Sequence, residues 1–322
     1  MIAHFRHSIE KGWNSVVGSG RVRGPLLTAG AQSKLSWATR VESYEEAPPV
    51  YRNFLDTVLA NEAGFPYTIL TPTFKGYMRE EKEKLVCVTR NEVFIVEKAR
   101  EGLTVTRFAG DDIHTVEMGA ILLYAWLTIR GKTSDGALIS STLKFNAVTG
   151  SLFNPILTMV RRADPAASET DLSAEMAKFR YLRDINFKFM NYARRTVAPG
   201  ETVIKTVLQP EIKTDLLRIL GRSLSTTLTT AHLSILTDKV LIVIRDDEED
   251  QWNQNIRYGG IWTYVPLDMI QSATPTPRSA DTFVLGLHLP ENDRIDFLFS
   301  TENAKDVQTL IDEMARIQPV RS

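Results

Sequence analysis

Histidine, cysteine and serine side chains could carry catalysis or bind a metal in this chain, and their spacing favours neither role. The five histidines form no His-x-x-x-His pair. The single cysteine, Cys87, has no second cysteine for a Cys-x-x-Cys motif or a disulfide, and the apolar run 85–88 around it indicates a buried strand thiol. No Gly-x-Ser-x-Gly nucleophile elbow is present. We therefore expect a non-catalytic protein without metal or cofactor, and an enzyme whose site assembles only in space stays open as an alternative.

A second chemical candidate is the segment from Leu172 to Arg195, which alternates basic and aromatic residues and is predicted to form one long inter-domain helix. Its Arg180 and Lys188 are candidate ligand-binding residues for an anionic surface. Arg183 and Arg194 fall inside the apolar arc of that helix, which spoils a helix lying flat on a membrane. The pattern favours a helix packed between two domains.

Composition limits the protein class. The chain has 322 residues, 38 Lys and Arg against 39 Asp and Glu, and a formal net charge of −1. This length predicts two domains, and the charge balance argues against bulk electrostatic binding of nucleic acid. The start of the chain lacks the apolar core of a signal peptide, and the longest apolar stretch, 121–129, is too short to cross a bilayer. We expect a cytoplasmic protein with peripheral membrane contact at most.

An internal repeat organises the chain. Residues 85–96 align without gaps on 233–244, and both read as two β-branched runs around a polar turn, the signature of a hairpin. Upstream, 67–72 matches 205–210. Downstream, Phe108 aligns on Val265 and Ile113 on Ile270. The strands 124–129 and 282–287, and then 142–145 and 296–299, complete the same order of five elements in both copies.

A helix ends each copy. The second is predicted after Ser300 or Thr301 from apolar residues at helical spacing up to Ile317. In the first copy, Asn154 and Pro155 resemble an N-cap followed by proline at the first helical position. Residues 49–60 predict one amphipathic helix, with Val50, Phe54, Leu55, Val58 and Leu59 as its apolar face. The predicted domains are an N-terminal extension over 1–65, a first β-rich domain over 66–163, a linker and inter-domain helix over 164–198, and a second β-rich domain over 199–322.

Six or seven antiparallel strands closed by one C-terminal helix resemble the pleckstrin-homology-like (PH-like) superfold, including bacterial PH-like and GRAM-like domains. The resemblance covers about 66–162 and 201–317 and rests on element order, because the superfold has no invariant motif. The first copy departs from the pattern in its short, proline-bearing helix. The resemblance implies an α+β, mainly β fold: two antiparallel barrels or sandwiches, each capped by a helix, plus the long inter-domain helix and a mixed N-terminal extension.

The resemblance also implies binding of lipid headgroups, peptides or partner proteins. PH-like domains that hold phosphorylated headgroups use basic residues in the loop after the first strand, which here implies Lys213, Arg218 and Arg222 in the second copy. The residues 216–220 suggest a short helix in that loop. The leading hypothesis is a binding or scaffold protein that holds a protein partner, or a second copy of itself, through grooves or strand edges. The alternative is a peripheral binder of anionic lipid headgroups, and no nucleic-acid partner is expected.

Overall fold

The computed structural model describes residues 36–60, 62–75, 80–162, 172–219, 222–246 and 259–318. Its contacts divide the chain into two compact units. Unit 1 comprises Met1–Asp112, Leu122–Thr128 and Lys132–Ile156. Unit 2 comprises Ile113–Ile121, Ile129–Gly131 and Leu157–Ser322. The described residues are mainly β, with antiparallel sheets and a C-terminal helix.

Unit 1 is built on an antiparallel sheet. The strands β1 (Thr39–Val41), β2 (Tyr67–Leu70), β5 (Lys84–Val88), β6 (Glu92–Lys98) and the first part of β7 (Leu103–Ile121) pair in that order. A short hairpin joins β3 (Phe74–Lys75) to β4 (Glu80–Glu81). The strands β8 (Tyr124–Thr133) and β9 (Leu138–Asn146) pair with each other, and η1 (Ala147–Phe153) and α4 (Asn154–Val160) follow them. Burial alternates strictly along β8, as expected of a strand with one face in a core.

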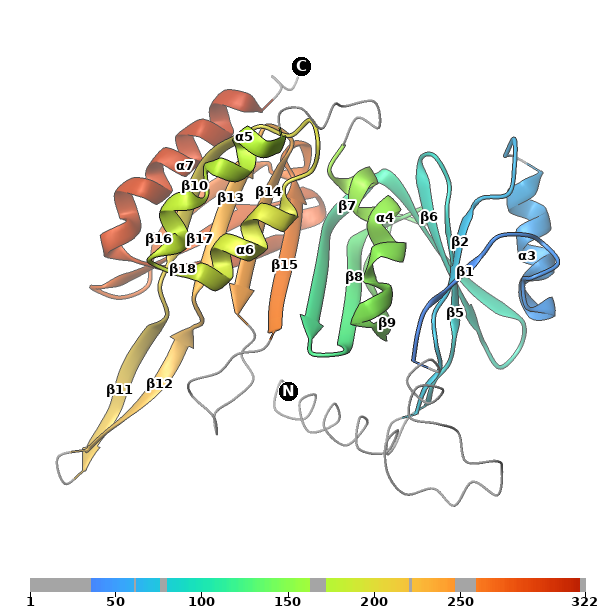
Figure 1. The fold of residues 1–322 in the computed structure, drawn as a ribbon, viewed down its shortest axis with the longest axis horizontal. Coiled ribbons are helices and arrows are strands. Elements are labelled where there is room, and N and C mark those ends of the chain that lie inside the picture. Colours follow the sequence, from blue (N-terminus) through green and yellow to red (C-terminus); the bar gives the residue numbers. More distant parts are fainter. Residues whose placement is uncertain are drawn as a thin grey trace. The chain divides into compact units, whose positions relative to one another are not determined.

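Helix α3 (Pro49–Leu59) lies where the sequence predicts an amphipathic helix, and it packs on the sheet of unit 1 (Figure 1). Its buried residues are Tyr51, Leu55 and Val58, whose i, i+4, i+7 spacing places them on one side. Tyr51 replaces Val50 in the predicted apolar face, because the Tyr51 hydroxyl donates to the Glu83 carbonyl (3.0 Å) while its ring is fully buried. Val50 is exposed.

Unit 2 contains two larger sheets and a separate two-stranded ribbon. In the first, β10 (Val203–Gln209), β13 (His232–Thr237), β14 (Val240–Asp246), β15 (Gly259–Pro266) and the second part of β7 pair in that order. The second consists of β16 (Ser272–Pro277), β17 (Thr282–His288) and β18 (Arg294–Ser300), and helix α7 (Ala304–Ile317) follows it. The turns η4 (Leu267–Met269), η5 (Pro290–Asn292) and η6 (Thr301–Asn303) connect these elements.

The first sheet of unit 2 is buried on both faces. Leu241 and Val243 pack in one core with residues of β16–β18 and α7. The alternate residues Ile242 and Ile244 are equally buried on the opposite face, which helices α5 (Leu172–Ala177) and α6 (Phe187–Thr196) cover with the turn η3 (Arg180–Arg183) (Figure 1). Burial on both faces explains why β14 begins with the continuous apolar run Val240–Ile244 and why all six residues of β13 are buried.

The hairpins β5–β6 and β13–β14 have the same register. Adding 148 to each partner in the pairs Leu85↔Val96 and Val88↔Val93 gives the observed pairs Leu233↔Ile244 and Leu236↔Leu241. The preceding strands agree as well, because Tyr67 pairs with Val88 as Lys205 pairs with Leu236. In the following strands, Phe108 lies opposite Val93 as Val265 lies opposite Leu241. The alignment of the two stretches therefore holds at the level of individual residue pairs.

Two helix predictions are wrong. The long inter-domain helix over 172–195 is three short pieces, α5, η3 and α6. Asn186 caps α6 by accepting from the Phe189 amide (3.1 Å), so the chain turns before α6 and buries Phe179 and Leu182. Of the short helix suggested at 216–220, the described residues 216–219 lie instead in a two-stranded ribbon of β11 (Ile212–Ile219) and β12 (Arg222–Thr229). The β-branched residues along both arms favour the strand.

Candidate binding groove

The groove between β16 and α7 is the candidate functional site. It encloses about 250 Å³ and is lined by Pro275, Pro277, Phe283, Ala304, Val307, Gln308 and Ile311. Six of these seven side chains are apolar, so the groove suits an apolar side chain of a ligand. Its volume lies below the roughly 300–1,000 Å³ of small-molecule sites. The size therefore favours a side chain or two of a larger partner.

One wall of the groove is an edge strand. In the described part of the chain, β16 pairs with β17 and with no other strand. Pro275 and Pro277 have no N–H to donate, whereas the Arg278 amide donates to the Thr282 carbonyl (3.0 Å). Amides alternate in direction along a strand, so Thr274 and Thr276 face β17, and Ala273, Pro275 and Pro277 face the open edge. That edge offers carbonyl acceptors and a single N–H donor, from Ala273.

Helix α7 supplies the other wall. Ser300 caps the turn η6 that leads into the helix, by accepting from the Glu302 amide (3.1 Å). Val307, Leu310 and Met314 are buried at i, i+3, i+7 spacing and fix the helix on the core. Ala304 and Gln308 also line the groove but are exposed to solvent, so the groove is open where these two side chains lie.

The predicted ligand residues Lys213, Arg218 and Arg222 lie on the β11–β12 ribbon and not in the groove. Arg218 and Arg222 are brought close together, because Arg218 pairs with Ser223 and Ile219 pairs with Arg222. Lys213 lies farther along the ribbon, opposite Thr227, and forms an ion pair with Glu211 (3.1 Å).

Arg180 and Lys188 are on separate elements with different environments. Arg180 is exposed on η3. Lys188 on α6 forms an ion pair with Asp246 of β14 (2.7 Å), and its ammonium lies over the Tyr192 ring (5.5 Å). Its charge is therefore neutralised within the fold, whereas Arg180 remains available at the surface.

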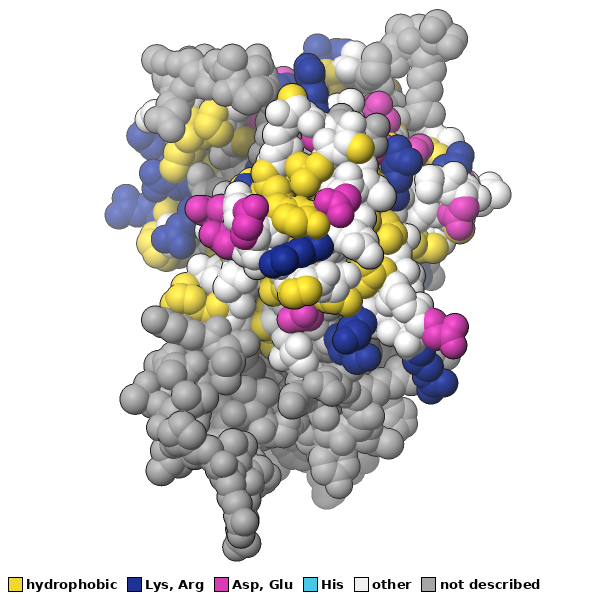
Figure 2. Space-filling model, turned by 90° about the vertical axis from the view of Figure 1, so that its right-hand side faces the viewer, with side chains coloured by type: hydrophobic (Ala, Val, Ile, Leu, Met, Phe, Trp, Pro, Cys, Tyr) yellow, Lys and Arg dark blue, Asp and Glu magenta, His cyan; other side chains and the backbone are white. Residues whose placement is uncertain are grey.

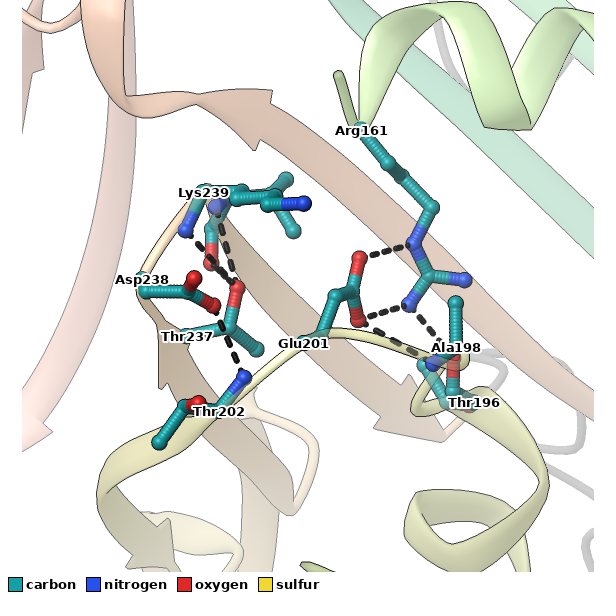
Figure 3. Close-up of polar contacts among 9 residues, drawn as sticks. Arg161, Thr196, Ala198, Glu201, Thr202, Thr237, Asp238 and Lys239 are labelled. Carbon is teal, nitrogen blue, oxygen red and sulfur yellow. Dashed lines mark hydrogen bonds and ion pairs between the residues drawn. The ribbon is translucent and has the colours of Figure 1, made fainter. Parts of the chain in front are cut away.

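Arg161 and Glu201 form a buried, two-bond ion pair (Figure 3). The Arg161 guanidinium donates to both Glu201 oxygens (2.8 and 2.9 Å), and the Ala198 amide donates to Oε2 (3.1 Å). Burial raises the pKa of Glu201, although the charge of Arg161 opposes this shift. Both carboxylate oxygens are occupied and the side chain is fully buried, so the pair presents no free acid or base, and loss of either partner would leave a buried unpaired charge.

His114 is the centre of a second charge cluster in unit 2. Its Nδ1 lies 3.1 Å from Asp293 and its Nε2 lies 3.0 Å from Glu291. Arg130 also donates to both oxygens of Asp293 (2.8 and 2.6 Å). Burial alone raises the pKa of Asp293, but hydrogen bonds from Arg130 and His114 outweigh it and hold that pKa below its usual range. Both imidazole nitrogens are engaged, so the cluster anchors β7 and β8 to the η5 turn.

Cys87 is buried as predicted, and burial raises the pKa of its thiol to about 11. A protonated, enclosed thiol is a poor nucleophile. Within the described ranges, no group of three or more His, Cys, Asp or Glu side chains has a geometry that could hold a metal ion. None of the described helices combines the length and apolar character needed to cross a membrane.

The side of unit 1 that carries α3 has a mixed surface. Figure 2 shows apolar side chains there next to both positive and negative ones. Phe54 and Phe94 pack edge to face (5.7 Å), and Arg107 lies over Phe94 while donating to Glu92. The charge of Arg107 is therefore paired with that of Glu92, in contrast to the arginines around α6.

Sequence reasoning missed the groove. A signal was available, because the alternating prolines of 272–277 (Ser-Ala-Thr-Pro-Thr-Pro) are compatible with an edge strand and not with a central one. No family model and no curated protein sequence matches the chain.

Proposed function

We propose that this chain is a non-catalytic binding protein that holds a segment of a partner protein in the groove between β16 and α7. The observation that carries the proposal is the open, apolar groove beside an edge strand that retains carbonyl acceptors. Burying one large apolar side chain there contributes about 1.5–3 kcal/mol. Backbone amides of an extended partner can donate to the Ala273, Pro275 and Pro277 carbonyls, which is the edge-pairing mode of peptide recognition.

We also infer that the two β-rich stretches are sibling PH-like domains. Three features support this inference: the matched register of the two hairpins, the division of the second stretch between a sheet holding β10, β13, β14 and β15 and a sheet of β16–β18, and a helix after the last strand. A further correspondence supports the inference. The hydroxyls of Thr128 and Thr142 lie 2.9 Å apart in the first copy, and the residues aligned with them in the second copy, Gly286 and Asp296, lie opposite each other in the β17–β18 pair. A PH-like fold by itself does not assign a ligand.

The proposed role of the groove can be tested with a substitution that obstructs it. Ala304→Arg places a long charged side chain at the exposed rim of the groove without changing a buried residue. Proteins captured by the wild-type chain from a lysate of its own cells, and cross-linked to it near 275–277, are expected to be lost with this variant. Gln271→Arg is the matched control, since it adds the same side chain at an exposed position outside the groove. Equal capture by the wild type and Ala304→Arg would count against the groove.

A further inference from the structure

Exposed apolar side chains gather between η3 and α6. Ile185 is 65% exposed, Phe187 is 59% exposed and Tyr181 is 46% exposed. Three of the nine large apolar side chains that are exposed in the described part of the chain thus fall within seven consecutive residues. A contiguous patch of exposed apolar residues marks an interaction surface more often than a single exposed apolar residue does.

Four exposed arginines flank these side chains: Arg180, Arg183, Arg194 and Arg195. None of the four forms an ion pair with another described residue, whereas neighbouring Lys178 and Lys188 pair with Glu175 and Asp246. The one exposed acidic residue among them is Asp184, so the patch carries an excess of positive charge.

The patch is held in a fixed orientation. Phe189, Met190 and Ala193 bury the opposite side of α6, and Leu182 anchors η3. Phe187 and Arg194 are seven residues apart, about two turns, and therefore lie on the same outer side of α6. The Tyr181 hydroxyl is bonded to Thr206 of β10 (2.7 Å), which ties η3 to the sheet.

The chemistry of this surface matches a lipid headgroup layer. The exposed apolar side chains lie among the exposed arginines, so a bilayer, with its anionic layer and its apolar interior, can contact both kinds of side chain. Apolar side chains between arginines can enter the acyl boundary while the guanidinium groups contact phosphates. Each arginine near an anionic bilayer strengthens binding by about fivefold.

We propose that the η3–α6 surface (Arg180, Arg183, Ile185, Phe187, Arg194 and Arg195) docks on anionic phospholipid bilayers, with Ile185 and Phe187 inserted and the arginines on the headgroups. The surface lies on other elements than the groove of β16 and α7, so the proposal stands independently of the partner segment. This surface is formed by the turn η3 and the short helix α6, and not by the single long helix that the sequence predicts.

Vesicle co-sedimentation of the full chain tests the proposal. Wild-type protein is expected to bind vesicles of phosphatidylcholine with phosphatidylserine, to bind phosphatidylcholine alone far more weakly, and to be released by high salt. The double variant Arg180→Gln, Arg183→Gln is expected to bind about thirtyfold more weakly. Phe187→Ser is expected to lose about tenfold or more.

Matched controls are Arg278→Gln and Val148→Ser, which alter an exposed arginine and an exposed apolar residue elsewhere. Both are expected to bind anionic vesicles as the wild type does. Unchanged unfolding midpoints verify that all variants are folded. No binding to anionic vesicles, or equal binding by wild type and Phe187→Ser, would overturn the proposal. So would a change in self-association with Phe187→Ser without any vesicle binding, because the surface would then be an interface between copies.

Discussion

The strands that follow the two matched hairpins behave differently. After β6, strand β7 runs without interruption for 19 residues. After β14, strand β15 ends at Pro266, and η4 intervenes before β16 begins. Ala109 of β7 aligns on Pro266, so the break falls where one copy has alanine and the other has proline. Proline fixes φ and lacks a donor, which makes it a natural end for a strand.

This difference decides which strand edge is used. The second part of β7 pairs with β15 through Val116 to Ile121, and the His114–Asp293–Arg130 cluster holds it there. The aligned strand β16 has no such partner among the described strands, and prolines occupy two of its open-edge positions. One strand of the pair is therefore covered by sheet, whereas its counterpart keeps one edge open among the described strands.

The largest expected effect comes from removing the anchor of β7. Asp293→Ala leaves the buried His114 without its Nδ1 partner and Arg130 without its carboxylate. We expect the free energy of unfolding to fall by about 3 kcal/mol, measured by urea denaturation. Asp296→Ala, which removes an exposed carboxylate on β18, is the control and is expected to cost less than about 1 kcal/mol. Equal losses in the two variants would show that the cluster is not the anchor.

The next largest effect is a pH dependence of stability that we expect from His232 but not from Lys84, the residue at the equivalent position in the first hairpin. Lys84 forms an ion pair with Glu97 (2.9 Å), whereas His232 is buried beside Phe299 with its Nε2 unbonded among the described residues. Burial lowers the pKa of His232 to about 4, from an ordinary value of 6.5. Between pH 6.5 and pH 4 the imidazole is protonated in the unfolded chain but neutral in the folded one. The free energy of unfolding therefore falls as the pH falls through this range.

The expected loss from pH 6.5 to pH 4 is about 3 kcal/mol from this one group. His232→Leu should flatten the pH dependence of the unfolding free energy over that range. Lys84→Met, at the equivalent position of the first hairpin, has no imidazole to remove and should leave the slope unchanged. A slope that persists in His232→Leu would contradict the assignment.

A smaller effect concerns the prolines of β16. Replacing Pro275 and Pro277 by valine restores two N–H donors on an open edge and raises its tendency to pair with other chains. We expect concentration-dependent self-association by analytical ultracentrifugation, with the unfolding free energy changed by less than about 1 kcal/mol. Thr274→Val with Thr276→Val is the matched control, because those amides face β17. Association by both variants alike would imply that side-chain hydrophobicity, and not the donors, drives it.

The sequence predicts the matched hairpins and the alignment of Phe108 on Val265, which the structure places opposite the equivalent residues Val93 and Leu241. Strand residues there are β-branched and buried, so local pattern and tertiary environment agree. The segment 172–195 was mispredicted because helical periodicity continues through Asp184 and Asn186, whose turn and cap preferences the pattern ignores. The groove could not be derived, because it depends on how α7 packs against β16, which no local pattern specifies.

Amide hydrogen exchange at Ala273 and Met118 tests the contrast between the open and the covered edge most directly. Ala273 carries the one N–H expected on the open edge of β16, whereas Met118 lies opposite Trp262 in the part of β7 that pairs with β15. The backbone groups of Met118 face β15, because those of the neighbouring residue pair, Thr263 and Glu117, point away from each other. We expect the Ala273 amide to exchange fast in the free protein and to become protected when a partner segment occupies the groove, while the Met118 amide stays protected throughout. An Ala273 amide as slow as that of Met118 in the free protein, or unaffected by a partner captured there, would contradict an open binding edge at β16.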